Sequence, residues 1–320
     1  MKQSVASKSV ASIVLAFLVA GNTAWALWVG GDTRPWDRVT RDFVSNETFS
    51  ATDGEQDGRR LKELDRKRAA EFLVPFLEST QPRALRVRAM GAVGKAALTE
   101  AVPALIKIAQ NPAEGENIRA AALSPGLRYM SHLDAIQCAT TLASDPSLRV
   151  RMAAYWVLGQ HGTDEAVSVL ERRLSEKDPQ ETVQLLYALC FSKNGRAGRI
   201  VFDHTDFDAL QTDEHRQAYA KTMADYHVRE AEQNMLTLAR QRDQPWSASY
   251  ALRYFAAFPR DDIAPALVAY VEACPAVHDL YDTVIAFIES PEIAKESKEK
   301  LFELVVTGKI KKKRRIGHDL

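Results

Sequence analysis

Residues 145–162 read DPSLRVRMAAYWVLGQHG, and this stretch decides the fold. It opens on Asp145-Pro146, where proline fits the first turn of a helix and cannot continue a preceding one. Small and apolar residues follow. The stretch ends with Gly159 and Gly162, and glycine is the residue that most often closes a helix. The pattern predicts one helix with a marked beginning and end.

The same elements recur about every 32 residues along the chain. A polar residue followed by proline occurs at 81–82, 111–112, 145–146, 178–179 and 244–245. A valine–arginine pair or a related pair occurs at 87–88, 118–119, 150–151, 183–184 and 215–216. A period of this length, sustained over so many units, is typical of a solenoid built from helix pairs.

A second helix is predicted in each unit. The clearest examples cover residues 99–110, 163–175 and 261–273. Thr99 and Thr163 are suited to cap such helices, and Val102, Leu105 and Ala109 fall on one helical face. We therefore predict an all-α fold, a right-handed α-solenoid of about seven helix pairs over residues 61–308. Residues 66–79 would be the second helix of an incomplete first unit, and 292–306 would be a capping helix.

The units resemble HEAT repeats, and in particular the short repeats of the phycobilin-lyase type. The family pattern is D-P-x-x-V-R-x-x-A-A-x-x-L-G, followed after a gap by A-V-x-x-L. It is matched here by Asp145-Pro146, Val150-Arg151, Ala153-Ala154, Leu158-Gly159, Ala166-Val167 and Leu170. The resemblance covers roughly residues 66–306 and is strongest over 81–190. It implies that Arg88, Arg119 and Arg151 are structural arginines that brace a neighbouring turn, often through the aspartate of the loop.

Residues 1–26 are predicted to be a secretory signal peptide. Lys2 and Lys8 precede an apolar run, and Ala24 and Ala26 are the small residues that a signal peptidase requires. The alternative is an uncleaved anchor formed by residues 10–29, since the uncharged span of 23 residues could cross a bilayer. Both alternatives export the rest of the chain, because the basic end stays inside. We expect a bacterial periplasmic protein.

Residues 27–60 carry glycine, threonine, serine and aspartate without helical periodicity. The segment also holds four aromatic residues, too many for a plain linker, namely Trp28, Trp36, Phe43 and Phe49. We predict an irregular segment that either folds back on the first repeat or docks on a partner.

Charge divides the chain into an acidic body and a basic end. Residues 27–308 hold 34 basic and 41 acidic residues, a net charge of −7. The tail 309–320 holds six basic residues and one acidic residue. The tail is either a solvated end or a contact to an anionic surface, such as lipid, a cell-envelope polymer or an acidic partner. The acidic body speaks against nucleic-acid binding, which requires a basic surface.

Catalytic and metal-binding motifs are missing from the sequence. The three cysteines are widely spaced, and none of the seven histidines stands in a metal-binding or catalytic pattern. Asp203, His204, Asp206 and Asp208 cluster after Gly195 and Gly198, which should interrupt a second helix. The cluster lacks the glycine bend and late glutamate of a calcium loop, so a polar loop is the favoured interpretation. We predict no catalytic residue, no metal, no cofactor and no enzyme activity.

These observations favour a noncatalytic, exported scaffold or adaptor that binds another protein through the solenoid surface. Four cations of the predicted second helices are candidate partner contacts, namely Lys107, Arg172, Arg173 and Arg240. The alternative function is a carrier or lyase-like binder of a tetrapyrrole, or of another apolar ligand, in the groove of the solenoid.

Overall fold

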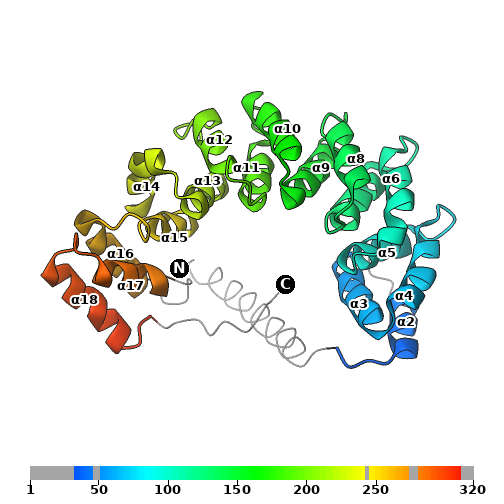
Figure 1. Ribbon diagram of the computed structural model, residues 1–320, viewed down its shortest axis with the longest axis horizontal. Helices are drawn as coiled ribbons and strands as arrows, with labels where there is room; N and C mark the ends of the chain where they lie inside the picture. Colours follow the sequence, from blue (N-terminus) through cyan, green and yellow to red (C-terminus); the bar gives the residue numbers. More distant parts are fainter. Residues whose placement is uncertain (1–31, 46–50, 242–244, 274–279, 311–320) are drawn as a thin grey trace, which may run out of the picture. The chain divides into compact units, whose positions relative to one another are not determined.

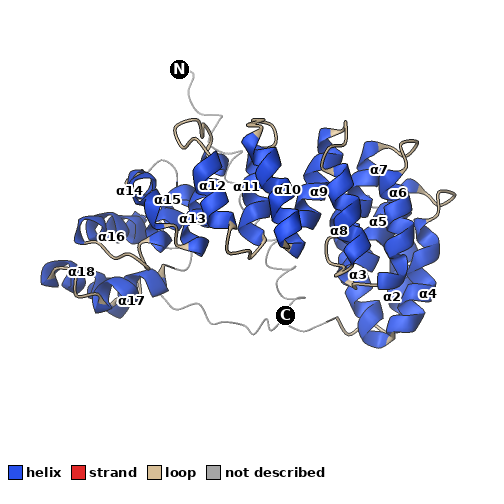
Figure 2. Cartoon of the chain, turned by 45° about the horizontal axis from the view of Figure 1, so that its top comes forward, coloured by secondary structure: helices blue, strands red, loops and turns tan. Residues whose placement is uncertain are grey.

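The computed structural model describes residues 32–45, 51–241, 245–273 and 280–310. Over these residues the fold is helical, without a strand, as Figure 2 shows. The predicted all-α solenoid class is confirmed. The chain divides into two compact units, Met1–Ala104 and Leu105–Leu320. The predicted cleavage residues Ala24 and Ala26, the possible anchor at 10–29 and tail residues 311–320 lie outside the described residues.

The first unit holds two helices that were not predicted. Its elements are α2 (Trp36–Ser45), α3 (Ala51–Leu64), α4 (Arg66–Leu73), the 3-10 turn η1 (Val74–Leu77), α5 (Arg83–Lys95) and the turn η2 (Thr99–Ala101). The prediction of an irregular segment over residues 27–60 is therefore wrong for α2 and α3. With α3 present, the first repeat is complete, because α3 pairs with α4 and packs along α5.

Two glycines explain why α3 escaped prediction. Gly54 and Gly58 lie one helical turn apart on the side of α3 that meets α5. A Cβ atom at Gly54 would overlap the carbonyl group of Arg88, and one at Gly58 would overlap that of Ala92. Glycine lowers helix propensity, so these positions look irregular in the sequence. In the structure they allow two helix backbones to touch.

The described aromatic residues of the N-terminal segment fold back on the first repeat. The Phe43 ring lies 5.8 Å from the Phe72 ring and 5.6 Å from the Phe76 ring, and Trp36 lies 6.2 Å from Phe72. Arg34 adds an ion pair to Asp57 of α3 at 2.7 Å. Of the two alternatives for this segment, folding back thus holds for residues 32–45.

The second unit arranges its helices in two layers. After α6 (Val102–Gln110), which spans the boundary, come α7 (Glu116–Ala121), the π-helical turn η3 (Ala122–Leu127), α8 (Leu133–Leu142), α9 (Leu148–His161), α10 (Asp164–Ser175), α11 (Thr182–Phe191) and α12 (Ala197–His204). Then follow α13 (Asp213–Tyr226), η4 (Arg229–Ala231), α14 (Glu232–Ala239), α15 (Pro245–Tyr254), η5 (Asp261–Ile263), α16 (Ala264–Ala273), α17 (Tyr281–Glu289) and α18 (Lys295–Val306). In Figure 1, α9, α11, α13 and α15 follow one another as first helices, each packed on the next.

The stretch at 145–162 forms α9 and its flanking turns. Gly162 adopts φ +57°, the left-handed conformation that closes a helix, and its amide donates to the Leu158 carbonyl at 2.9 Å. Gly159 faces α11, where a Cβ atom would overlap the Ala188 backbone. Leu158 and Tyr155 are fully buried. Small residues therefore bring α9 and α11 together, as the repeat pattern indicates.

The second helices agree closely with the predicted ranges. Turn η2 with α6 covers 99–110, α10 covers 164–175, and η5 with α16 covers 261–273. Thr163 caps α10 through a hydrogen bond from the Ala166 amide, whereas Thr99 lies inside η2 and makes no cap. Gly198 lies inside α12 and does not interrupt it. The described residues form eight helix pairs from α3 to α18, one more than about seven, because α3 completes the first.

No helix among the described residues is long and apolar enough to cross a membrane.

Candidate functional site

The arginine of α7 holds the loop that opens the next unit. Arg119 donates from Nε to the Ala109 carbonyl at 2.9 Å and forms an ion pair with Asp145. Asp145 also accepts a hydrogen bond from the Ser147 amide at 2.9 Å, at the start of α9. Arg119 and Asp145 are both buried. The aspartate–proline pair of the repeat is thus fixed by the preceding unit.

Two further repeat arginines also serve internal contacts. Arg151 donates to the carbonyls of Asp145 at 2.9 Å and Pro146 at 3.1 Å, and its Nε lies 2.5 Å from Glu181. Arg88 is fully buried in the first unit and donates from Nη1 to the Phe43 carbonyl. Each of these side chains fixes a neighbouring segment within the same one of the two compact units.

Glu181 is the centre of a buried ionic network. It has no exposed surface, and it accepts hydrogen bonds from Tyr155, Arg151 and Arg173. Burial alone would raise the pKa of the Glu181 carboxyl, but the hydrogen bonds from Tyr155 and the two arginines hold it below its usual value. The carboxylate therefore stays ionised and joins α9, α10 and α11.

Arg173, one of the four predicted partner contacts, belongs to this network. Its side chain is only 14% exposed, and it contacts Glu181 at 2.9 Å, Glu176 at 2.6 Å and the Tyr155 hydroxyl at 2.9 Å. The donors of its guanidinium are used in these internal contacts. The sequence could not reveal this, because the position of Glu181 in its unit is occupied by Leu148 in the preceding unit, so no recurring acidic residue marks it.

The other three predicted contacts are exposed but are not brought together. Lys107 lies on α6, Arg172 lies on α10, and Arg240 follows α14. Arg240 is 57% exposed and forms an ion pair with Asp262 at 2.9 Å. The three cations thus lie on, or directly after, three separate second helices.

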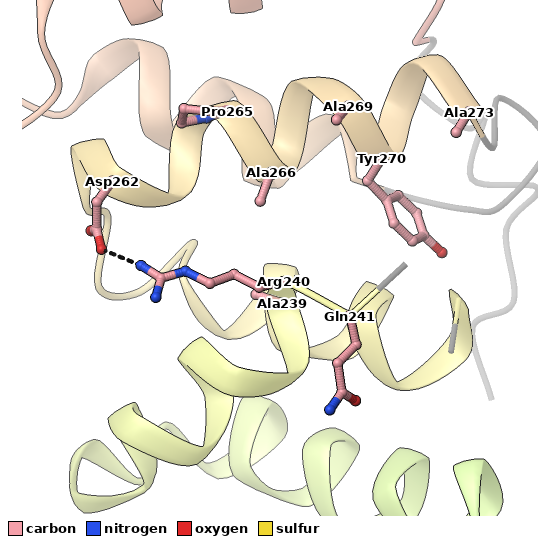
Figure 3. A pocket seen from close by; sticks show the side chains of 9 residues that line it. All are labelled: Ala239, Arg240, Gln241, Asp262, Pro265, Ala266, Ala269, Tyr270 and Ala273. Atoms are coloured by element: carbon pink, nitrogen blue, oxygen red, sulfur yellow. Dashed lines mark hydrogen bonds and ion pairs between the residues drawn. The ribbon is translucent and has the colours of Figure 1, made fainter. Parts of the chain in front are cut away.

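Arg240 borders a groove between α14 and α16, shown in Figure 3. The groove has a volume of about 390 Å³. One wall is made of small residues of α16, namely Pro265, Ala266, Ala269 and Ala273. The Arg240–Asp262 pair stands at one end, and Tyr270 and Gln241 stand at the other. Its size and lining suit an apolar side chain.

A more extended feature runs over the first helices, and we call it the aromatic row. It comprises Trp156 of α9, Tyr187 and Phe191 of α11, and Trp246 and Tyr250 of α15. Trp156 lies 5.6 Å from Phe191 and 6.4 Å from Tyr187, measured between ring centroids. Phe191 is 40% exposed and Trp246 is 45% exposed, while the other three rings are half-buried. Rings of this size usually complete a core, so their exposure here is notable.

Cations connect the rings of the aromatic row. Lys221 of α13 places its Nζ 5.1 Å from the Phe191 ring and 5.9 Å from the Tyr250 ring, bridging α11 and α15. Arg253 lies 5.1 Å from the Tyr250 ring, and Arg128 lies 4.6 Å from the Trp156 ring. Burial alone would lower the pKa of Lys221, but its hydrogen bond with Asp225 raises it, so Lys221 is charged at neutral pH.

The acidic cluster after α12 is explained by local contacts. Asp203 pairs with Arg199 at 2.8 Å, His204 lies 3.6 Å from Glu171, and Asp206 accepts from the Asp208 amide. Over residues 32–45, 51–241, 245–273 and 280–310, no group of three metal-binding side chains is positioned to hold an ion.

Comparison with known families agrees with this architecture. The family model for HEAT repeats matches residues 114–190. This part of the chain consists of HEAT repeats. The matched range covers the helices from α7 to α11, together with most of the Arg119–Asp145 and Glu181 networks. HEAT repeats generally mediate protein–protein interactions.

Other comparisons add little. No curated protein matches the chain. A crystal structure of an engineered protein is similar to it, with 16% sequence identity and a TM-score of 0.44 over 84% of this chain and 77% of that chain.

The aromatic row was missed by sequence reasoning. Trp156 lies inside the stretch that reveals the repeat, directly after the buried Tyr155. The apolar period marks both residues as core. Only their position around the helix separates them, since Trp156 is turned about 100° from Tyr155. Aromatic residues at the surface-facing position of several first helices are the signal that could have found the row.

Proposed function

We propose that this protein is a noncatalytic scaffold that binds a protein partner through the aromatic row. The observation that carries the proposal is the continuous set of half-exposed rings over α9, α11 and α15, linked by Lys221 of α13. Aromatic side chains and arginine supply most of the binding energy at protein interfaces. A solenoid binds partners along several units, and the row follows that geometry.

Internal contacts of the repeat support the choice of this surface. The conspicuous cations Arg119, Arg151 and Arg173 make ion pairs inside the fold. In the aromatic row, by contrast, Phe191 and Trp246 are 40% and 45% exposed. Their exposed apolar area is costly in water, and a partner that covers it would gain the corresponding free energy.

The binding proposal is tested by capture with matched variants. Tagged wild-type protein is crosslinked in its native cells, purified and analysed by mass spectrometry. The test variant is Phe191→Ala with Trp246→Ala. The control is Leu133→Ala with Phe302→Ala, since these side chains are 62% and 57% exposed outside the aromatic row. We expect the test variant to lose the main partner by about tenfold or more for each ring.

Two results would contradict this proposal. The first is equal capture of the main partner by the test variant and the control. The second is a stoichiometric pigment or lipid in the purified protein with no enriched protein, which would favour the ligand-carrier alternative. Thermal unfolding of each variant establishes that the comparison is made between folded proteins.

We also propose that the scaffold is exported. The basic start, the apolar run and the alanines at 24 and 26 support this proposal. The intact mass of the protein from native cells tests cleavage, and fractionation tests location. A mature chain beginning at Leu27 in the periplasmic fraction is expected. A full-length chain in the cytoplasmic fraction would contradict export.

A further inference from the structure

Three cations lie beside the rings of the aromatic row, namely Arg128, Lys221 and Arg253. Among the described residues, Arg128 is the one of the three that has no acidic partner. Lys221 and Arg253 both pair with Asp225, the latter at 3.4 Å. For Arg128, no carboxylate lies within ion-pair distance among the described residues, and its Nε is buried without a hydrogen-bond partner. Its side chain follows the π-helical turn η3 and is half-buried.

Arg128 is held in place by aromatic rings instead. Its guanidinium carbon lies 4.6 Å from the Trp156 ring and 5.4 Å from the Tyr129 ring. Such contacts orient the planar group without neutralising its charge. A guanidinium in this position can bind a carboxylate with two parallel hydrogen bonds, for which arginine is better suited than lysine.

Apolar surface lies directly beside this cation. The Trp156 ring, on which Arg128 rests, stands 5.6 Å from the Phe191 ring, and Phe191 is 40% exposed. A ligand whose carboxylate reaches Arg128 would therefore place its neighbouring group over Trp156 and Phe191. An aliphatic or aromatic side chain would bury that surface.

The net charge beside the aromatic row is also more positive than the net charge of the body around it. The row has three cations, Arg128, Lys221 and Arg253, against Asp225 and the nearby Glu214, whose charge acts on Tyr187. The body over residues 27–308 carries a net charge of −7. The basic tail 309–320 carries charge of the same sign as the row, so charge complementarity favours an acidic occupant over the tail.

We propose that the aromatic row binds an extended acidic segment of the partner protein. A glutamate or aspartate of that segment binds Arg128, and the adjacent apolar side chain covers Trp156 and Phe191. The row spans three steps between neighbouring first helices, each about 8–10 Å. An extended peptide rises about 3.3 Å per residue, so about nine residues cover the row. This inference rests on the proposed function.

The test uses full-length protein and defined peptides. The probe is a synthetic peptide of about nine residues that alternates glutamate and leucine, with blocked ends. A glutamine–leucine peptide and a lysine–leucine peptide are the charge controls, and polygalacturonate is the acidic saccharide control. Affinity is measured by calorimetry at low and high salt. The variants are Arg128→Gln and Arg128→Lys, and the control is Arg41→Gln, which removes an exposed arginine from α2.

We expect the glutamate peptide to bind and the two charge controls to bind at least tenfold more weakly. Arg128→Gln should weaken binding about tenfold, Arg128→Lys less, and Arg41→Gln should have no effect. High salt should weaken binding, since the contact is ionic. No binding of the glutamate peptide, equal binding of the glutamine peptide, or no effect of Arg128→Gln would overturn the inference. Binding of polygalacturonate in place of the peptide would assign the row to a saccharide.

Failure of this inference can be told apart from failure of the proposed function. Capture of the native partner that depends on Phe191 and Trp246 but not on Arg128 leaves the scaffold standing and removes the acidic segment. Capture that is independent of all three residues removes both.

Discussion

At the residue scale, the fold depends on ionic contacts that the repeat pattern only partly reveals. Glu181 accepts hydrogen bonds from Tyr155, Arg151 and Arg173 without any exposure to solvent. Replacing it leaves two buried or partly buried guanidiniums without their common counter-charge. Removal of one partner from a buried ion pair is far more damaging than loss of a surface pair, because the remaining charge stays desolvated.

Glu181→Gln should therefore destabilise the protein strongly. The variant keeps the shape of the side chain but loses its charge, and we expect a loss of about 3 kcal/mol in the free energy of unfolding. The matched control is Glu176→Gln, since Glu176 also pairs with Arg173 but is 46% exposed. The control should change stability by no more than about 0.5 kcal/mol. Urea unfolding at neutral pH measures both, and equal effects would contradict a buried network.

The same network predicts how this difference depends on pH. The pKa of Glu181 is lowered in the folded protein from its usual 4.5. The contribution of its carboxylate to the free energy of unfolding is therefore fully present above that pH. As pH falls further, the carboxyl of the folded protein must take up a proton, and the contribution is lost. The stability difference between wild type and Glu181→Gln should therefore shrink below about pH 4.5. A difference that stays constant into stronger acid would argue against an ionised Glu181.

At the element scale, the contact between α3 and α5 depends on glycine. Isolated helices gain about 1 kcal/mol when an interior glycine becomes alanine. Gly58→Ala should do the opposite here, because the new Cβ atom would overlap the Ala92 carbonyl group. We expect a loss of about 1–3 kcal/mol, as in overpacked cores.

Gly195→Ala is the control for this change. Nothing lies within 4 Å of the Cβ position at Gly195, so its stability should stay within about 0.5 kcal/mol of wild type. Thermal unfolding compares the two variants. A stabilised Gly58→Ala protein would show that α3 and α5 do not touch as described.

The outcome for particular elements shows what the sequence could predict. Helices α6, α10 and α16 were placed within a few residues, because proline, capping residues and the apolar period all agree there. Helix α3 was missed because its glycines are explained only by a neighbour 34 residues away, Arg88 for Gly54 and Ala92 for Gly58. The aromatic row was missed for a related reason, since an apolar period does not distinguish the buried Tyr155 from the half-exposed Trp156.

At the scale of the whole molecule, the repeats convert a local feature into an extended surface. Each first helix of the second unit packs on the next, so side chains at surface-facing positions of α9, α11, α13 and α15 join into one row. The ionic networks lie within and between repeats, while the aromatic row is the partner surface that we propose. That surface uses other residues of the same helices, so variants of Phe191 and Trp246 leave the ionic networks intact.

The central claim is that a partner protein contacts the aromatic row, and photocrosslinking tests it most directly. A photoreactive phenylalanine analogue is placed at position 191 in one protein and at position 302 in another, since both side chains are exposed phenylalanines. After irradiation of intact cells, we predict one main protein adduct from position 191 and little of it from position 302. Adducts of equal yield from both positions, or from position 302 alone, would contradict the claim.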